Sequence, residues 1–365
     1  MTITSLDTHG APPRATSPAA RGNGAVRAWL WTVAFLVMAM VVVGGATRMT
    51  ESGLSITEWK PIHGVVPPLS DAEWQEEFEK YQQIPQYQVM NSDMTLDGFK
   101  TIFWWEWAHR LLGRAIGFVF LVPFLYFAAT GAIPRDMRGR IGLLFVLGGL
   151  QGAVGWWMVA SGLTERTEVS QLRLAIHLTF ACVILVATIA AAERLRPPAR
   201  GPAEPDRLGR GARLLVLLLL AQVFLGGLVA GLRAGLIYNT WPLMEGQIVP
   251  AGLLSMSPWW LNFFENHLTV QFVHRIGAYV LIAAVLWHFL IVRQWALYGS
   301  TVRSAALLVA AVLAQAVIGI VTLLLVVPIE MGLLHQGFAV VVLAVATVHA
   351  VRLVGRGVPL ARASA

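Results

Sequence analysis

Charge and cysteine are both scarce in this sequence. Charged residues make up 13% of the 365 positions, against roughly 25% in an ordinary soluble domain, which excludes that class. Cys182 is the single cysteine, so the chain can form neither an internal disulfide bond nor a cluster of thiolate metal ligands. No lysine follows Lys100. No basic stripe of the kind that binds nucleic acid is present, so nucleic acid is not an expected partner.

Long hydrophobic runs are abundant instead. Hydrophobic residues account for 56% of the chain, and a helix needs about 20 apolar residues to cross the hydrocarbon core. Backbone groups in lipid must bond within the chain, so these runs predict helices and an all-α membrane protein in contact with lipid. The eight predicted transmembrane helices are 27–47, 105–130, 139–161, 171–193, 211–232, 268–292, 303–327 and 331–353.

The distribution of arginine predicts the topology. Arginines gather in the N-terminal tail, in the second, fourth and sixth connections and at the C-terminus, whereas acidic residues concentrate in the other connections. By the positive-inside rule, both termini are expected in the cytoplasm. The first hydrophobic run leads into a long polar loop without a signal-peptide cleavage pattern, so we expect a permanent helix. The predicted location is the cell inner membrane, as a multi-pass protein.

An internal repeat divides the eight helices into two halves. The first and fifth helices and the loops after them align at a constant offset, pairing Gly44-Gly45 with Gly226-Gly227, Gly53-Leu54 with Gly235-Leu236, Trp59 with Trp241, Gly64 with Gly246 and Pro68 with Pro250. The later helices pair His109-Arg110 with His274-Arg275, Gln151 and Gly155 with Gln315 and Gly319, and His177 with His335. Four helices per half make both halves face the same way. The sequence thus predicts two parallel-repeat four-helix bundles.

The repeat also sets the expected domain boundaries. We expect a disordered cytoplasmic tail over 1–26, an N-terminal half over 27–193, a cytoplasmic linker over 194–210, a C-terminal half over 211–353 and a tail over 354–365. The first outer loop is longer than its counterpart, and it is acidic and aromatic. Such an insertion is typical of a loop that handles a substrate or partner, although a loop that only covers the bundle fits equally.

Four histidines are candidate haem ligands. His109, His177, His274 and His335 each lie near the start of a helix that runs inward from the periplasmic side. Two imidazoles at one depth on neighbouring helices can ligate a haem iron from both faces, and each half supplies one such pair. The alternative is a set of satisfied structural histidines. Zinc is less suited, because two His without Cys make a poor tetrahedral set.

A rival pairing uses His288 and His349. These residues follow His274 and His335 at the same spacing on their helices, which is typical of the stacked haems of a di-haem b-type electron-transfer or quinol-oxidising membrane anchor. The first half does not repeat that spacing, since Pro123 and Ala191 occupy the corresponding positions. The stacked arrangement would therefore leave His109 and His177 unexplained.

Polar neighbours of the histidines suggest further roles. Arg110 and Arg275 directly follow two of them, and a guanidinium can bind a haem propionate or extend to the membrane interface. Glu106 precedes His109 by three residues, on the same helix side, where the second half has Gln271. Gln cannot exchange a proton, so the difference favours Glu106 as a catalytic proton carrier in the first half. The alternative is a carboxylate that only stabilises a helix N-terminus.

Taken jointly, these residues resemble the haem A synthase family over about 27–353. The resemblance rests on Gly-Gly-Ala-Thr-Arg at 44–48, Gly53-Leu54-Ser55, Trp59-Lys60-Pro61, Glu106-x-x-His109-Arg110, His177, Trp241-Pro242, His274-Arg275 and His335. One branch of the family has a cysteine pair in the first outer loop. Without that pair, the chain resembles the mitochondrial-type branch.

The resemblance implies an activity and its ligands. The implied reaction oxidises the C8 methyl group of haem O to a formyl group, which gives haem A for terminal oxidases. His109 and His177 would flank the substrate haem, His274 and His335 would bind a b-type haem, and Glu106 would be required for turnover. Expected partners are haem O, an unidentified electron donor of the quinol or ferredoxin type, and haem O synthase with oxidase assembly factors. A transporter is a further alternative, because parallel repeats are common there.

Overall fold

The structure is a computed structural model that describes residues 18–59, 63–164, 166–197 and 201–354. The described residues form helices and no strand, and eight of the helices are long and apolar enough to cross a membrane. The predicted class, an all-α multi-pass membrane protein, is therefore confirmed. The eight are α1 (Pro18–Met49), α4 (Leu96–Ala129), α5 (Arg135–Ala160), α6 (Gln171–Arg194), α7 (Asp206–Gly231), α10 (His267–Trp295), α11 (Gly299–Leu324) and α12 (Ile329–Val354).

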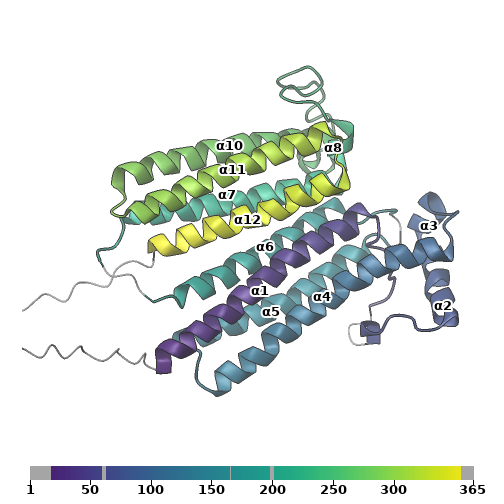
Figure 1. Ribbon diagram of the computed structural model, residues 1–365. Coiled ribbons are helices and arrows are strands. Elements are labelled where there is room, and N and C mark those ends of the chain that lie inside the picture. Colours follow the sequence, from purple (N-terminus) through teal and green to yellow (C-terminus); the bar gives the residue numbers. More distant parts are fainter. Residues whose placement is uncertain (1–17, 60–62, 165, 198–200, 355–365) are drawn as a thin grey trace, which may run out of the picture.

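The long helices pack as two neighbouring groups (Figure 1). In the first group α1 contacts α4 and α6, and α5 lies between α4 and α6. In the second, α7 contacts α10 and α12, and α11 lies between α10 and α12. The groups meet where α6 packs on α7 and α12 and where α1 packs on α12. The internal repeat and the domain boundaries remain predictions from the sequence, and much of both predicted tails lies outside the described residues.

Ion pairs connect the two groups at both ends. Glu193 on α6, with a fully buried side chain, pairs with Arg27 of α1 and Arg352 of α12 at 2.7 Å each. At the other end, Glu51 after α1 pairs with Arg233 after α7 at 2.7 Å. Glu51 and Arg233 occupy positions that the repeat predicts as equivalent, and both have left-handed backbones, with φ of 57° and 51°. The two turns therefore face each other and carry opposite charges.

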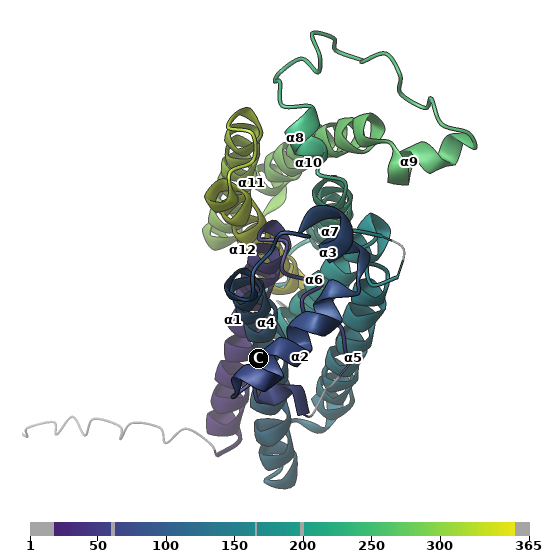
Figure 2. The ribbon, with the colours of Figure 1, turned by 90° about the vertical axis from the view of Figure 1, so that its right-hand side faces the viewer.

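The long first outer loop forms two short helices, α2 (Asp71–Gln82) and α3 (Pro85–Met90). A capping box between Ser70 and Glu73 starts α2, and amide hydrogen bonds from Leu69 and Ser70 lower the pKa of Glu73. Helix α2 packs on the N-terminal end of α4, and α3 packs on α2 (Figure 2). The buried aromatic residues of this contact are Trp74, Phe78, Tyr81, Phe99 and Phe103.

This packing explains one of the two largest errors in the predicted helix boundaries. We expected a membrane helix from residue 105, but α4 begins at Leu96, where Thr95 caps it. The additional turns continue past the apolar run because Phe99 and Phe103 are buried against α2. Glu106 is consequently far from the helix start. The alternative in which Glu106 only stabilises a helix N-terminus is wrong.

The outer connections of the second group are short or irregular. They contain α8 (Ala234–Ile237), the 3-10 turn η2 (Trp259–Leu261) and α9 (Asn262–Glu265). In the first group, the part of the connection before α2 that the structure describes contains the 3-10 turn η1 (His63–Val65). No counterpart of α2 and α3 occurs among the described residues of the second group. The additional outer helices are therefore specific to the first group.

Candidate functional site

The four candidate histidines lie on α4, α6, α10 and α12. His177, His274 and His335 lie within about the first two turns of their helices, as expected. His109 is more than three turns into α4, because that helix starts early. His109 and His177 are close enough to interact electrostatically, and so are His274 and His335. The structure thus brings together the two predicted pairs.

Each of these imidazoles lies against a glycine of a neighbouring helix. A Cβ atom on the glycine would lie 3.4 Å from the His109 ring at Gly44, 2.9 Å from His177 at Gly155, 3.2 Å from His274 at Gly226 and 2.6 Å from His335 at Gly319. Real Cβ contacts essentially never fall below 3.0 Å. A side chain at Gly155 or Gly319 would therefore collide with the imidazole, whereas one at Gly44 or Gly226 would be in close contact with it.

Glutamines hold three of the four rings. Gln151, Gln222 and Gln315 each place the amide nitrogen 3.1 Å from Nδ1 of His177, His274 and His335, and each also donates to the backbone carbonyl of that histidine. The amide oxygen of all three glutamines is buried without a partner among the described residues. Met40 occupies the position that the repeat pairs with Gln222. His109 has no such glutamine in the described part of the chain.

The rival pair has a different geometry. Nε2 of His288 lies 3.0 Å from Nε2 of His349, and the two rings are nearly perpendicular. Two nitrogens bound to opposite faces of one iron would be about 4 Å apart, at roughly 2 Å per bond. Nδ1 of His349 also hydrogen-bonds to Ser304 at 2.7 Å. In the structure these two imidazoles therefore contact each other directly, and the stacked arrangement stays an alternative.

Glu106 is almost completely buried, with 2% of its surface exposed. Its Oε2 accepts hydrogen bonds from the Ser55 hydroxyl and the Ile56 amide, both at 2.8 Å. Its Oε1 pairs with Arg110, at 2.6 Å from Nη2 and 3.1 Å from Nε. Arg110 also donates to the backbone carbonyls of Ile56 and Glu58. The carboxylate is thus fixed and charge-compensated, and within the described residues its hydrogen-bond partners are Ser55, Ile56 and Arg110.

The corresponding position in the second group lacks the charge pair. Gln271 donates through Nε2 to the Tyr238 carbonyl at 2.6 Å. Arg275 donates to the same carbonyl at 3.3 Å. Its Nε and Nη1 atoms are buried and, within the described ranges, have no hydrogen-bond partner. A guanidinium in this state can bind an anion such as a carboxylate.

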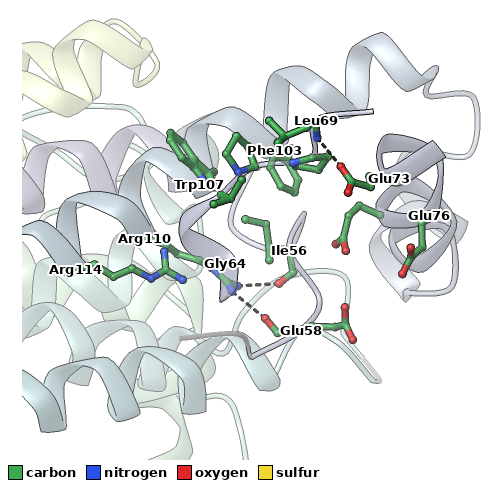
Figure 3. A pocket seen from close by; sticks show the side chains of 14 residues that line it. Ile56, Glu58, Gly64, Leu69, Glu73, Glu76, Phe103, Trp107, Arg110 and Arg114 are labelled. Atoms are coloured by element: carbon green, nitrogen blue, oxygen red, sulfur yellow. Dashed lines mark hydrogen bonds between the residues drawn. The ribbon is translucent and has the colours of Figure 1, made fainter. Parts of the chain in front are cut away.

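A cavity of about 440 Å³ opens beside Arg110 under the outer helices (Figure 3). Arg110 and Arg114 project into it from α4, and Glu76 lies across it on α2. Lys80 of α2 lies beside these residues and pairs with Glu76 at 2.7 Å and with Glu58 at 2.9 Å. Although burial favours the neutral amine, these carboxylates raise the pKa of Lys80. The cavity therefore has a cationic floor and an acidic wall.

Comparison with known proteins identifies relatives over most of the chain. Residues 27–347 match the family described as cytochrome oxidase assembly protein. A protein named heme A synthase from Mesorhizobium japonicum is 57% identical over 330 residues, or 90% of each chain. Proteins of the same name from Azorhizobium caulinodans and Chelativorans sp. are 57% and 56% identical, covering 93% and 92% of this chain and 96% and 93% of theirs.

Proposed function

The chain belongs to the haem A synthase family, and from that premise we propose how its own residues carry out the reaction. Its function is that of an oxidoreductase that converts haem O to haem A, and haem is therefore involved. In this reaction the C8 methyl group of haem O is oxidised to a formyl group. The proposals concern which residues hold which haem, where the proton goes, and which side of the membrane the site faces.

His274 and His335 are proposed to ligate a resident b-type haem. The glycines behind these rings and the glutamines beside them support this assignment. Ligation through Nε2 leaves the proton on Nδ1, which then needs an acceptor. The glutamine atom beside Nδ1 is the Nε2 donor, at 3.1 Å, so an amide that turns over on haem binding would offer its oxygen, which is buried without a partner within the described residues. When bound, the haem iron supplies the redox chemistry of the site.

Arg275 is proposed to bind a propionate of that haem. Two buried guanidinium nitrogens without a partner in the described ranges favour an anionic ligand. Arg110 has a different role, because Glu106 and two carbonyls already accept its hydrogen bonds. Arg110 instead holds Glu106 in place and presents its remaining donor to the cavity. The sequence suggested the same role for both arginines, and the contacts favour it for Arg275.

His109 and His177 are proposed to flank the substrate haem O, with Glu106 as the proton-transfer residue. Oxidising a methyl group to a formyl group requires proton transfers, and a fixed carboxylate within one helical turn of the proposed ligand His109 can take part in them. Ser55, Ile56 and Arg110 fix both carboxylate oxygens before substrate binds. Gln271 cannot do this in the second half, which favours a non-catalytic haem there.

The orientation and the partners are also proposals. We place both termini in the cytoplasm of a bacterial inner membrane, with the haem sites toward the periplasm, because arginine gathers on the opposite connections. Electrons are exchanged with a quinol or a ferredoxin-type protein. Haem O synthase and oxidase assembly factors are the proposed neighbours. None of the described contacts bears on these partners.

One observation carries the proposed assignment: among the described residues each half has a histidine pair, but only the first half has a buried carboxylate, Glu106, one turn before a histidine of that pair, where the second half has Gln271. Pigments extracted from the purified protein are expected to contain haem B together with haem O or haem A. The His274→Ala variant should lose haem B, and the His109→Ala variant should lose haem O and haem A but keep haem B. His288→Leu should lose neither. Haem B alone in the wild-type protein, or its loss on replacing His288, would support the di-haem carrier instead.

A further inference from the structure

Two adjacent glycines on α1 contact different halves of the molecule. Gly44 lies under the ring of His109, where a Cβ atom would be 3.4 Å from Nε2. Gly45 lies against α12, where a Cβ atom would be 2.5 Å from Oε1 of Gln336. Successive residues on a helix point in directions about 100° apart. One short segment of α1 therefore supports a ligand of the first half and a side chain of the second.

Gln336 directly follows His335, the proposed ligand of the resident haem. Its Nε2 donates a 2.7 Å hydrogen bond to the backbone carbonyl of Val41, one turn before Gly45. The amide thus packs on Gly45 and bonds to the turn below it. This contact connects the helix of His335 to the helix that supports His109.

The equivalent contact on the other side of the molecule is apolar. The repeat pairs Gln336 with Leu178, which follows His177 and has no hydrogen-bonding side chain. There, Gly227 of α7 packs on Ala175 of α6, where a Cβ atom would be 2.8 Å from Cα. Helix α6 thus meets α7 by close packing alone at this depth. Of these two similar contacts, the one between α1 and α12 has a side-chain hydrogen bond from Gln336, and the one between α7 and α6 has an apolar residue, Leu178, at the corresponding position.

We propose that Gln336 is a positioning residue that couples the two haem sites, so that the state of the haem on His335 alters binding at His109. The inference rests on the proposed function, in which both sites bind a haem. Reduction removes one positive charge from the iron held by His335, next to Gln336 in the chain. A displacement of the α12 turn that contains His335 and Gln336 is passed through the hydrogen bond to the Val41 carbonyl to the segment of α1 behind His109. Packed helices transmit such shifts because their interfaces are close-packed.

Zinc protoporphyrin is a suitable probe, because it is a flat, redox-inert macrocycle with two propionates. It would be titrated by fluorescence into full-length protein that retains its resident haem, first oxidised and then reduced with dithionite, without oxygen. In the wild-type protein the two dissociation constants are expected to differ by roughly fivefold or more. The His109→Ala variant shows whether the probe occupies the proposed substrate site.

Two variants disrupt the link from opposite helices. Gln336→Met keeps the length of the side chain but removes the hydrogen bond to Val41. Gly45→Ala leaves Gln336 in place but introduces a methyl group that displaces its amide. In both, the ratio of the two dissociation constants should fall toward one while the low-spin spectrum of the resident haem persists. Leu178→Met, the matched control in the other half, should keep the wild-type ratio.

The outcomes separate the coupling from the function. A wild-type ratio of one, with binding abolished in His109→Ala, would reject the coupling and leave the proposed haem sites standing. An unchanged ratio in both Gln336→Met and Gly45→Ala would also reject it. Probe binding that is equally tight in His109→Ala would reject the proposed substrate site, and the coupling with it. A ratio that collapses in both variants but not in Leu178→Met supports the coupling.

Discussion

The two halves place the same arginine in opposite electrostatic surroundings. Arg110 pairs with the buried carboxylate of Glu106, whereas Arg275 has Gln271 as its neighbour and keeps two buried nitrogens without partners in the described residues. The positive charge of Arg110 is balanced by a carboxylate of the protein, whereas the positive charge of Arg275 can be balanced by an anionic ligand. One substitution, Glu for Gln, thus separates a site suited to proton transfer from a site suited to holding an anionic cofactor.

The two halves also differ in the side chains that pack around Trp29 and around its counterpart Gly211. In the first half Trp29 of α1 packs on Phe120 and Phe127, with ring centroids 5.0 and 5.7 Å apart. The repeat pairs Trp29 with Gly211, where a Cβ atom would be 2.7 Å from Nδ1 of His288. The indole fills the space that His288 occupies in the second half. The space beside His288 in the second half thus corresponds to a position filled by an aromatic core residue in the first half.

The strongest test of the comparison is Glu106→Gln, which gives the first half the residue of the second. The variant cannot accept a proton at this position, so turnover should fall by about 10²- to 10⁴-fold, as for other positioned acids and bases. Haem O, or a partly oxidised alcohol form, should accumulate in extracts from cells that carry it. The haem B content of the purified variant should be unchanged.

An exchange variant makes this test sharper. Glu106→Gln combined with Gln271→Glu keeps one carboxylate but moves it to the second half, and activity should remain low. Recovery of haem A in the exchange variant would show that either half can carry out the chemistry. Near-normal haem A from stably expressed Glu106→Gln would remove the proton-transfer role altogether.

Ser55→Ala should have the next largest effect. The Ser55 hydroxyl donates to Oε2 of Glu106, and a hydrogen bond to a charged group contributes about 1.5–3 kcal/mol. If that energy orients the carboxylate for reaction, turnover should fall by roughly 10- to 150-fold, with little change in the affinity for haem O. Ser55→Thr should restore most of the activity. The matched control is Ile237→Ala in the second half, and an equal loss of activity there would mean that the effect is structural.

Replacing the glycine behind a proposed ligand with alanine should weaken the binding of a different haem in each half. A Cβ at Gly319 would lie 2.6 Å from the His335 ring, and one at Gly155 would lie 2.9 Å from His177. Overpacking of this kind costs about 1–3 kcal/mol, so affinity should fall by roughly 5- to 150-fold at the affected site. Gly319→Ala should lose haem B from the purified protein, whereas Gly155→Ala should keep it and bind haem O weakly. Loss of the same haem from both variants would contradict the assignment.

Much of the fold follows directly from the sequence, and the exceptions have a common cause. Hydropathy detects runs of apolar residues, so it located all eight candidate spans. It missed the start of α4, because the first turns of that helix continue past the apolar run and pack against α2. The same limit applies to the site. Glu106 and the four histidines could be chosen from their positions in the repeat, but the contact of Glu106 with Ser55 spans about fifty residues and depends on tertiary packing.

The sequence singles out two of the three glutamines beside the histidines but does not indicate what they contact. Gln151 and Gln315 match in the repeat, which marked them as special without indicating what they contact. Gln222 gave no signal at all, because its counterpart Met40 is apolar. Recognising its role requires the knowledge that α7 packs on α10 beside His274. The mismatch between Met40 and Gln222 is informative only once this contact is known.

The smallest predicted effect concerns that mismatch. Met40→Gln would give His109 the amide partner that the other three rings have, and Met40 already lies beside Gly113, as Gln222 lies beside Gly277. A neutral hydrogen bond contributes about 0.5–1.5 kcal/mol, so haem O should bind roughly 2- to 13-fold more tightly. A substrate must leave as product, whereas a resident haem must stay. We therefore expect slower release of haem A and a lower turnover number in Met40→Gln, measured together with the affinity for haem O.

The reverse change, Gln222→Met, should loosen haem B by a similar factor. If neither variant changes the affinity of its own site, the missing glutamine does not distinguish the substrate site from the cofactor site.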